Sequence, residues 1–313
     1  MPTLTEILNE VNATGSGADV VRRKYIRHLH EVTGRNVIVY YSGWLQKPMP
    51  EIMGLFQVND NDKNGLMATI HQLDRKLGLD LVLHTPGGEA AATESVVAYL
   101  RQMFGTNIRA IIPQLAMSAG TMIALSCKEI LMGKESNLGP IDPQIGPFPA
   151  HGVVEEFKRA ASEIQMAADP NERAAKIAVW QPIIAKYNPT LIGQCDQAIA
   201  WSRDIVINWL QTGMFFGEQD GGKKASTVVD ELGSHTATKS HSRHIHSDRL
   251  RELGVKVVAL EDDQKLQDAV LTVHHACTHT LTHTPAVKII ENQNSVAFIT
   301  QIQMQVSPLR PMP

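Results

Sequence analysis

Apolar runs and segments of helical spacing alternate through the middle of this chain. The runs at 36–41, 79–84, 108–113 and 129–133 are rich in Val, Ile and Leu and predict buried strands. Helical patterns lie between the last three runs, one after a Gly-Gly turn and one after a Ser-containing turn. This alternation of strands and helices predicts an α/β domain.

The segments on either side of these strands are predicted to be mainly helical. Apolar spacing predicts helices at 4–11 and 20–32, and a largely helical stretch at 151–210 that two prolines, Pro182 and Pro189, interrupt. Beyond it we expect a strand at 254–258 and a hairpin formed by 286–290 and 296–303. The predicted divisions are an N-terminal helical arm (1–33), a core (34–262) with a helical insertion at about 151–212, and a C-terminal helix, hairpin and tail (263–313).

Composition and charge narrow the classes of function. The 313 residues are 43% hydrophobic and carry a net charge of −3, which gives no electrostatic preference for nucleic acid or an anionic membrane. No apolar run approaches the length of a membrane span, and no export signal is visible at the N-terminus. Three cysteines without paired spacing predict a reducing, cytoplasmic location. The one basic cluster, at 22–28, is predicted to be a solvated helix face.

Two turns of small residues follow predicted strands and carry the candidate chemistry. The first, His-Thr-Pro-Gly-Gly at 84–88, contains glycines that allow backbone N–H groups to point outward. The second, Ala-Met-Ser-Ala-Gly-Thr at 116–121, places Ser118 at the start of a helix. A serine there is either a helix cap or a nucleophile beside the positive end of the helix dipole. An acyl-transfer site would use Ser118 as the nucleophile and the N–H groups of Gly88 and Ala119 as an oxyanion hole.

The order of these elements, with a Gly-Pro-Ile-Asp loop at 139–142, resembles the Clp/crotonase superfamily. Within it, the chain is similar to the serine dehydrogenase proteinase family, soluble relatives of signal peptide peptidase A, over about 36–158. The resemblance implies a ββα spiral core, a nucleophile at Ser118, and oxyanion-hole N–H groups from the turn that contains Gly87 and Gly88. It also implies a peptide substrate that adds as a strand beside Gly88, and assembly into a homo-oligomer, either a trimer or a hexamer.

The general base of such a site is not evident from the nucleophile alone. Clp-type peptidases take a histidine from the loop that aligns with 136–146, but this loop carries Asp142 and no histidine. The signal peptide peptidase branch instead implies a lysine from a later helix, which here is Lys158, 40 residues after Ser118. A solvated helix face is the alternative for Lys158, and His151 is another candidate base. Further lysines that could replace it are Lys134, Lys176 and Lys186.

Other polar residues are assigned supporting roles or none. Asp142, held between two prolines, is predicted either to orient the base or to shape its turn. His84 is a candidate for a hydrogen-bonding role behind the oxyanion turn, with a buried core histidine as the alternative. The histidines at 241–246 are interpreted as structural, and those at 274–283 as surface groups without a physiological metal ion.

These residues predict an ATP-independent serine peptidase that hydrolyses peptides or unfolded protein through an acyl-enzyme, with Ser118 and Lys158 as a dyad. No cofactor is expected, because the chain has no Gly-x-Gly-x-x-Gly fingerprint and no clear lysine motif for pyridoxal phosphate. Two alternatives stay open: a crotonase-type acyl-CoA enzyme, which polarises a thioester with paired N–H groups, and a catalytically inactive oligomeric scaffold of the same fold. The expected partners are the substrate and further copies of the chain, with no nucleic acid and no membrane span.

Overall fold

The computed structural model describes residue 10 and residues 18–302, apart from the side chains of Thr236 and Ala237. The helix predicted at 4–11 therefore lies outside the described residues, except for Glu10. Within the described part of the chain, no helix is both long and apolar enough to cross a membrane.

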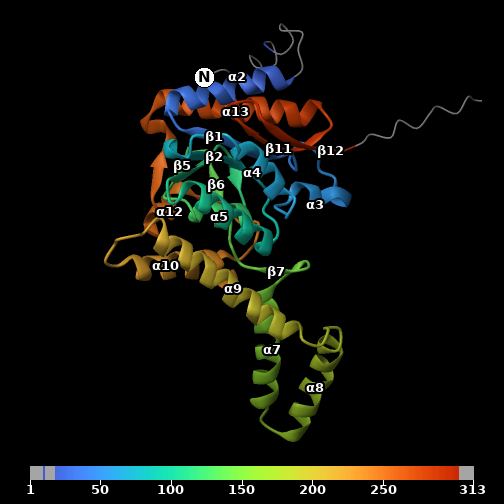
Figure 1. Ribbon diagram of the computed structural model, residues 1–313. Helices are drawn as coiled ribbons and strands as arrows, with labels where there is room; N and C mark the ends of the chain where they lie inside the picture. The colour runs from blue at the N-terminus through green and yellow to red at the C-terminus, as the bar shows by residue number, and fades with distance from the viewer. Residues whose placement is uncertain (1–9, 11–17, 303–313) are drawn as a thin grey trace, which may run out of the picture.

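A seven-stranded sheet forms the centre of the molecule (Figure 1). Its order is β10 (Val257–Ala259), β5 (Glu129–Met132), β3 (Ile108–Ile112), β2 (Leu79–His84), β1 (Asn36–Ser42), β11 (Ala286–Asn292) and β12 (Ala297–Gln301). The first five strands pair in parallel, whereas β11 pairs antiparallel with both β1 and β12. The four strands predicted for the core, the C-terminal hairpin and the α/β class are confirmed.

The strand predicted at 254–258 is displaced toward the C-terminus. Gly254 has a φ of +87°, a conformation that glycine adopts without strain, and it follows the short helix α12 (Ser247–Glu252). The N–H of Val255 donates to the carbonyl of Leu250 in that helix. Because these residues end the helix, pairing with β5 begins only at Val257.

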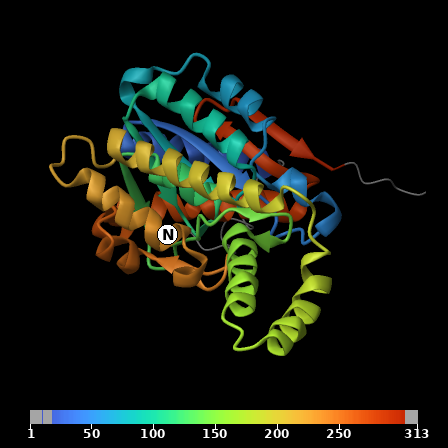
Figure 2. The ribbon, with the colours of Figure 1, turned by 90° about the horizontal axis from the view of Figure 1, so that it is seen from below.

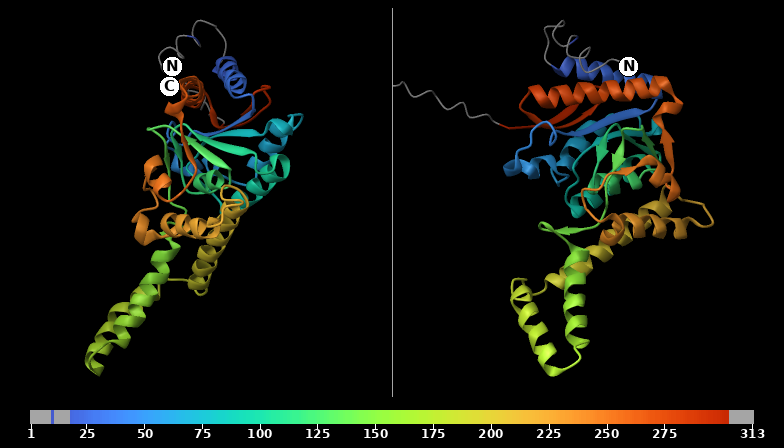
Figure 3. Two further views of the ribbon diagram at one scale, coloured as in Figure 1. Left: turned by 90° about the vertical axis from the view of Figure 1, so that its left-hand side faces the viewer. Right: turned by 180° about the vertical axis from the view of Figure 1, so that it is seen from behind.

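Alternate residues of each strand face opposite sides of the sheet, and each side has its own apolar core. On one side Ile38, Leu81 and Leu83 pack with α4 (Asp62–Ile70), α5 (Ala90–Phe104), α6 (Ala119–Leu125), α9 (Leu191–Thr212) and α10 (Gly221–Gly233). On the other side Val39 and Val82 pack with α2 (Ala18–Thr33) and α13 (Gln264–His283), which lie side by side across the sheet (Figures 1 and 3).

The sequence predicted that the basic cluster at 22–28 is a solvated helix face. The structure corrects this prediction, because not all of these side chains are solvated. Arg22 is fully buried where α2 packs against α13. Its Nε donates to the Glu291 carboxylate at 2.6 Å, and its Nη1 donates to the Thr280 hydroxyl at 3.0 Å. Glu291 lies on β11 and also accepts a hydrogen bond from Arg23 at 2.7 Å. The buried pair therefore joins α2 to the sheet, an arrangement that a one-dimensional charge pattern does not reveal.

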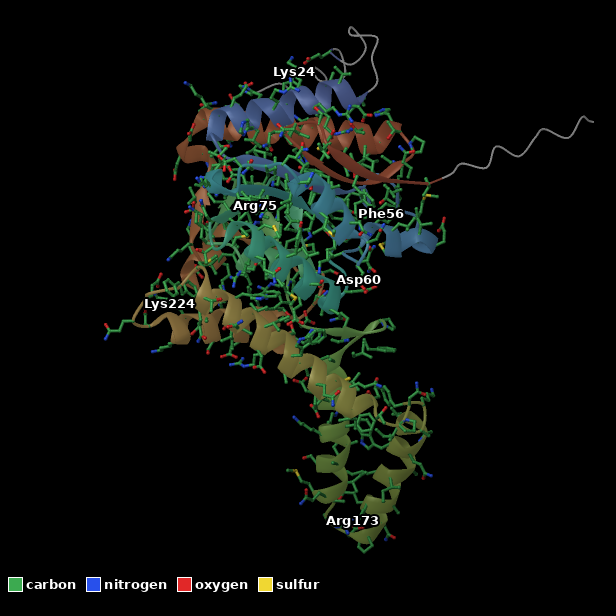
Figure 4. The ribbon with its side chains drawn as sticks, in the orientation of Figure 1. Lys24, Phe56, Asp60, Arg75, Arg173 and Lys224 are labelled. Carbon is green, nitrogen blue, oxygen red and sulfur yellow. The ribbon has the colours of Figure 1, made fainter. Side chains whose placement is uncertain are left out.

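Two helices, α7 (Ala150–Gln165) and α8 (Pro170–Ile184), project away from the sheet as an arm (Figures 1 and 2). Arg173 lies near the far end of this arm (Figure 4). A small cluster that includes Val153, Val154 and Cys195 joins α7 to α9. The insertion is helical, as predicted, although Pro182 lies inside the last turn of α8 and does not end it.

Short elements complete the fold. A second sheet contains β4 (Leu115–Ala116), β6 (Asn137–Leu138) and β9 (Ile245–His246), and β7 (Gln144–Ile145) pairs with β8 (Phe148–Pro149) as a separate hairpin. The remaining helical segments are α3 (Met53–Phe56), α11 (His235–Thr238), η1 (Pro50–Ile52), η2 (Arg75–Leu77) and η3 (Leu260–Asp262).

Candidate active site

Ser118 has a strained backbone and an unused hydroxyl. Its φ of +50° and ψ of −113° place a non-glycine residue in a region that side chains rarely adopt. It occupies the N-cap position of α6, yet its side chain does not cap the helix, and within 18–302 its Oγ forms no hydrogen bond. The capping interpretation therefore does not account for this serine. Strain of this kind is typical of functional residues that the surrounding fold holds in place.

The Gly-Gly turn packs directly against Ser118. A methyl group at Gly87, whose φ is +102°, would stand 2.6 Å from the Ser118 Cβ and 3.2 Å from the Ala119 nitrogen. Thr85 fixes this contact, because its N–H donates to Leu115 and its carbonyl accepts from Met117. The Gly-Gly turn after β2 and the Ser118 turn, which follows β3 and the short strand at Leu115–Ala116, are thus joined by backbone pairing. They lie beyond the carboxyl ends of neighbouring parallel strands, where α/β proteins commonly bind ligands.

Two backbone N–H groups next to Ser118 remain available. The Gly88 N–H has no acceptor among the described residues, and the same holds for Ala119, the first residue of α6. The Gly87 N–H, in contrast, donates to the Thr85 hydroxyl at 3.2 Å. Gly87 therefore allows its turn to approach Ser118 closely, whereas Gly88 and Ala119 have the free N–H donors that an oxyanion hole requires.

A cavity of about 540 Å³ opens beside Ser118. Its lining includes residues of the 86–90 segment and of the 141–146 loop. The residues that line it are Gln57, Pro86, Gly88, Glu89, Ala90, Ser118, Met122, Ile141, Asp142, Pro143, Gln144, Ile145, Gly146, Ala198, Trp201, Ser202 and His241. Among them are a serine, a histidine and a buried aspartate, the residue types of a nucleophilic triad.

Asp142 and His241 form a hydrogen-bonded pair in this cavity. The His241 Nδ1 lies 2.8 Å from Oδ1 of Asp142, whose side chain is completely buried. The Gln144 amide donates to the other carboxylate oxygen at 2.9 Å, and the Nδ1 of His235 lies 3.4 Å from that oxygen without forming a hydrogen bond. Since a carboxylate accepts at Nδ1, the proton of a neutral His241 is held there and Nε2 is left as an acceptor.

The second sheet explains why residues so distant in sequence meet. Strand β6 pairs antiparallel with β9, with Leu138 opposite Ile245. Asp142 lies four residues after Leu138 and His241 four residues before Ile245. The two residues are therefore equally far from the paired strands, and this pairing brings their segments together. The sequence analysis treated His241 as structural, and no local pattern indicates the pairing.

The structure does not bring the other candidate bases into the cavity. Lys158 is exposed on α7, in the projecting arm, and is not among the residues that line the cavity. His151 lies at the start of α7 and lines a separate cavity of about 90 Å³, which shares Ile141, Pro143 and Ser202 with the first. The remaining lysine candidates also lie outside the cavity lining: Lys134, Lys176 and Lys186.

His84 lies on the other side of the sheet from Ser118. Because side chains alternate along β2, it faces α13 together with Val82. Its ring stacks on Tyr41 with centroids 5.0 Å apart and lies 5.7 Å from the ring of His274. Burial lowers the pKa of His84 to about 4 and that of His274 to about 3. His84 is therefore a neutral core histidine, the alternative that the sequence analysis had kept open.

These two histidines make the fold sensitive to acid. In the unfolded chain each is protonated below about pH 6.5, while the folded protein keeps them neutral to about pH 4 and 3. The unfolded state then binds more protons, so the free energy of unfolding falls as the pH drops from 6.5, by about 3 kcal/mol through His84 alone at pH 4.

Urea unfolding at a series of pH values between 7 and 4.5 measures the slope of the free energy of unfolding against pH. We expect His84→Phe to flatten the slope and His71→Gln, at an exposed position, to leave it unchanged. An unchanged slope in His84→Phe would contradict the assignment.

The histidines at 274–283 are not all surface groups, which corrects the sequence interpretation in part. They lie on α13, where His283 is exposed, His274 and His275 are half-buried, and His279 is only 6% exposed. Among the described residues, no three His, Cys, Asp or Glu side chains are grouped so that they could hold a metal ion.

The three cysteines are free and buried. Burial raises the pKa of both Cys127 and Cys277 to about 12, which excludes these two as thiolate nucleophiles.

Comparison with known proteins places the chain in a family. A family model described as a ClpP-like SDH-type serine proteinase matches residues 15–181. The chain is 29% identical to an uncharacterized protein of Methanocaldococcus jannaschii over 196 residues, which cover 63% of this chain and 57% of that protein. It is 32% identical to a second uncharacterized protein of the same organism over 119 residues, 36% of this chain and 41% of that protein.

The chain thus spans about half the length of these curated relatives. The family match covers more than half of the chain, and it includes four of the five parallel strands (β1, β2, β3 and β5), the Gly-Gly turn and Ser118. The chain therefore belongs to the ClpP-like SDH-type serine proteinase family.

Proposed function

We propose that this protein is a serine peptidase in which Ser118 is the nucleophile, His241 the general base and Asp142 the residue that orients the base. The observation that carries the proposal is the shared cavity, which is lined by a strained serine and by a histidine hydrogen-bonded to a buried aspartate. Family membership supports the reaction class, acyl transfer to a serine.

The reaction follows from the proton positions. His241 Nε2 accepts the proton of the Ser118 hydroxyl as Oγ attacks the peptide carbonyl, and Asp142 stabilises the imidazolium that forms. The N–H groups of Gly88 and Ala119 donate to the oxyanion. The C–N bond then breaks, the leaving amine takes the proton from His241, and water hydrolyses the ester by the same route.

The turn beside Ser118 suits an extended peptide. Val58 already pairs with one edge of this turn through hydrogen bonds from its N–H to Gly87 and from Glu89 to its carbonyl. A peptide on the opposite edge would meet the free Gly88 N–H and the apolar side chains of Met122, Ile145 and Trp201. We therefore propose short or unfolded peptides as substrates.

An acyl-CoA substrate is less well matched to this cavity. Coenzyme A carries several phosphate charges, and phosphate sites ordinarily use Lys or Arg side chains. Among the described residues that line the cavity there is no Lys or Arg, and the acidic Glu89 stands at its edge. Charge therefore favours a peptide over a CoA thioester.

The proposal includes assembly with further copies of the chain. Large apolar side chains are exposed on the arm and beside the cavity, among them Met166 (78% exposed), Val179 (62%) and Phe148 (55%). Such exposure supports a homo-oligomer in which neighbouring subunits cover these side chains.

Hydrolysis of unfolded casein and of short fluorogenic peptides by Ser118→Ala tests the proposed function. Loss of the nucleophile is expected to lower kcat by roughly ten-thousandfold or more, with folding checked by circular dichroism. Ser202→Ala is the matched control, since this serine lines the same cavity and its hydroxyl donates to the Ile141 carbonyl. Equal activity in wild type and Ser118→Ala, or turnover of a CoA thioester without any peptide hydrolysis, would reject the peptidase assignment.

A further inference from the structure

We infer that Glu89 makes this site prefer peptides with a Lys or Arg side chain close to the scissile bond, an inference that rests on the proposed function. Glu89 lines the Ser118 cavity and is exposed to solvent. Within 18–302 its carboxylate forms no ion pair and no hydrogen bond, and it does not cap α5, although it occupies the N-cap position. Its charge is therefore available to a ligand.

The charges around the cavity are unbalanced. The ionisable side chains of the lining are Glu89, Asp142 and His241. The Asp142 carboxylate is buried and engaged by His241 and Gln144. No Lys or Arg belongs to the described lining, so no cationic side chain of the lining neutralises Glu89. A cationic substrate side chain would supply the missing opposite charge.

The backbone fixes where this charge stands relative to the reaction. Glu89 directly follows Gly88, whose N–H faces the oxyanion, and its own N–H donates to the Val58 carbonyl at 2.9 Å. Consecutive α-carbons are about 3.8 Å apart, so the Glu89 backbone lies next to the oxyanion turn, and its side chain, which lines the same cavity as Ser118, is within reach of substrate residues close to the bond that is cut. The hydrogen bond to Val58 holds the Glu89 backbone in place. We therefore expect the site to select the position of the cationic residue in the peptide as well as its charge.

Exposure limits the size of the effect. Ion pairs at exposed positions contribute little, and added salt screens them. We expect kcat/KM for a peptide with Lys near the scissile bond to exceed that of its Gln counterpart by about two- to fivefold at low ionic strength. A Glu at the same position is expected to lower kcat/KM by a similar factor, and 0.5 M salt to remove most of both differences.

The test compares peptides that differ only by Lys, Gln or Glu at one of the two positions on each side of the scissile bond. Each set is hydrolysed by wild type, Glu89→Gln and Glu89→Lys. The Lys-to-Gln ratio of kcat/KM is expected to fall to about one in Glu89→Gln, and Glu89→Lys is expected to prefer the Glu peptide. Glu94→Gln, which removes the same charge from α5, just after Glu89 but outside the cavity lining, should keep the wild-type ratio.

The outcomes separate this inference from the proposed function. Hydrolysis of the Gln peptide with a Lys-to-Gln ratio that is the same in wild type and Glu89→Gln would overturn the role of Glu89 and leave the peptidase intact. A ratio that falls equally in Glu89→Gln and Glu94→Gln would also overturn it, since the effect would then come from net charge. Failure of wild type to cleave any peptide, together with no labelling of Ser118 by a fluorophosphonate, would remove the proposed function and this inference with it.

Discussion

His241→Ala is expected to lower kcat for peptide hydrolysis by roughly a thousandfold or more. The reason is that Nε2 of this imidazole is the acceptor for the Ser118 proton, and a serine hydroxyl is a poor nucleophile without a base. Steady-state kinetics on a fluorogenic peptide measure the loss. KM should change little, because the imidazole acts on the proton and not on substrate side chains.

Two variants serve as controls for the His241 prediction. His244→Ala removes an exposed histidine three residues further along the same segment and should retain activity close to that of wild type. Lys158→Ala removes the base that the family resemblance had implied and should also retain activity. If Lys158→Ala were inactive and His241→Ala active, the base would be a lysine, supplied by the arm of another copy or by a rearrangement of this one.

Asp142→Asn is expected to lower kcat by roughly a thousand- to ten-thousandfold while the protein stays folded. Asparagine has nearly the same volume, but its amide can donate toward Nδ1 of His241, and this favours the tautomer that carries its proton on Nε2. That tautomer cannot accept from Ser118. Urea unfolding separates this effect from instability, since the Asp142 carboxylate is buried and also accepts from Gln144. A variant that retains more than a tenth of the wild-type kcat would show that Asp142 only shapes its turn.

Much of the fold followed from local patterns in the sequence. Strands β1, β2, β3 and β5 are short apolar runs bounded by turn residues, and their buried character is evident from composition. The Gly-Gly turn follows β2 directly, and the Ser118 turn follows β3 after the two-residue strand β4. Both turns lie just beyond the carboxyl ends of neighbouring strands, so the contact between Gly87 and Ser118 was accessible to sequence reasoning.

The identity of the general base depends on contacts between segments that are far apart in the sequence. His241 reaches Asp142 only because β9 pairs with β6 in one register, and both are strands of two residues. Such short strands leave no periodic signal in the sequence. Lys158 illustrates the opposite problem: its spacing from Ser118 matched the family pattern, yet α7 carries it into a projecting arm. For His84, the alternation along β2 was a usable signal, since Val82 and His84 share the face opposite Leu81 and Leu83.

The most direct test of the account is intact-protein mass after incubation with a fluorophosphonate at pH 8, for wild type, Ser118→Ala, His241→Ala and Lys158→Ala. The account predicts one adduct, mapped to Ser118, at similar rates in wild type and Lys158→Ala. It predicts no adduct in Ser118→Ala and labelling slowed by orders of magnitude in His241→Ala. Labelling of His241→Ala at the wild-type rate, together with no labelling of Lys158→Ala, would contradict it.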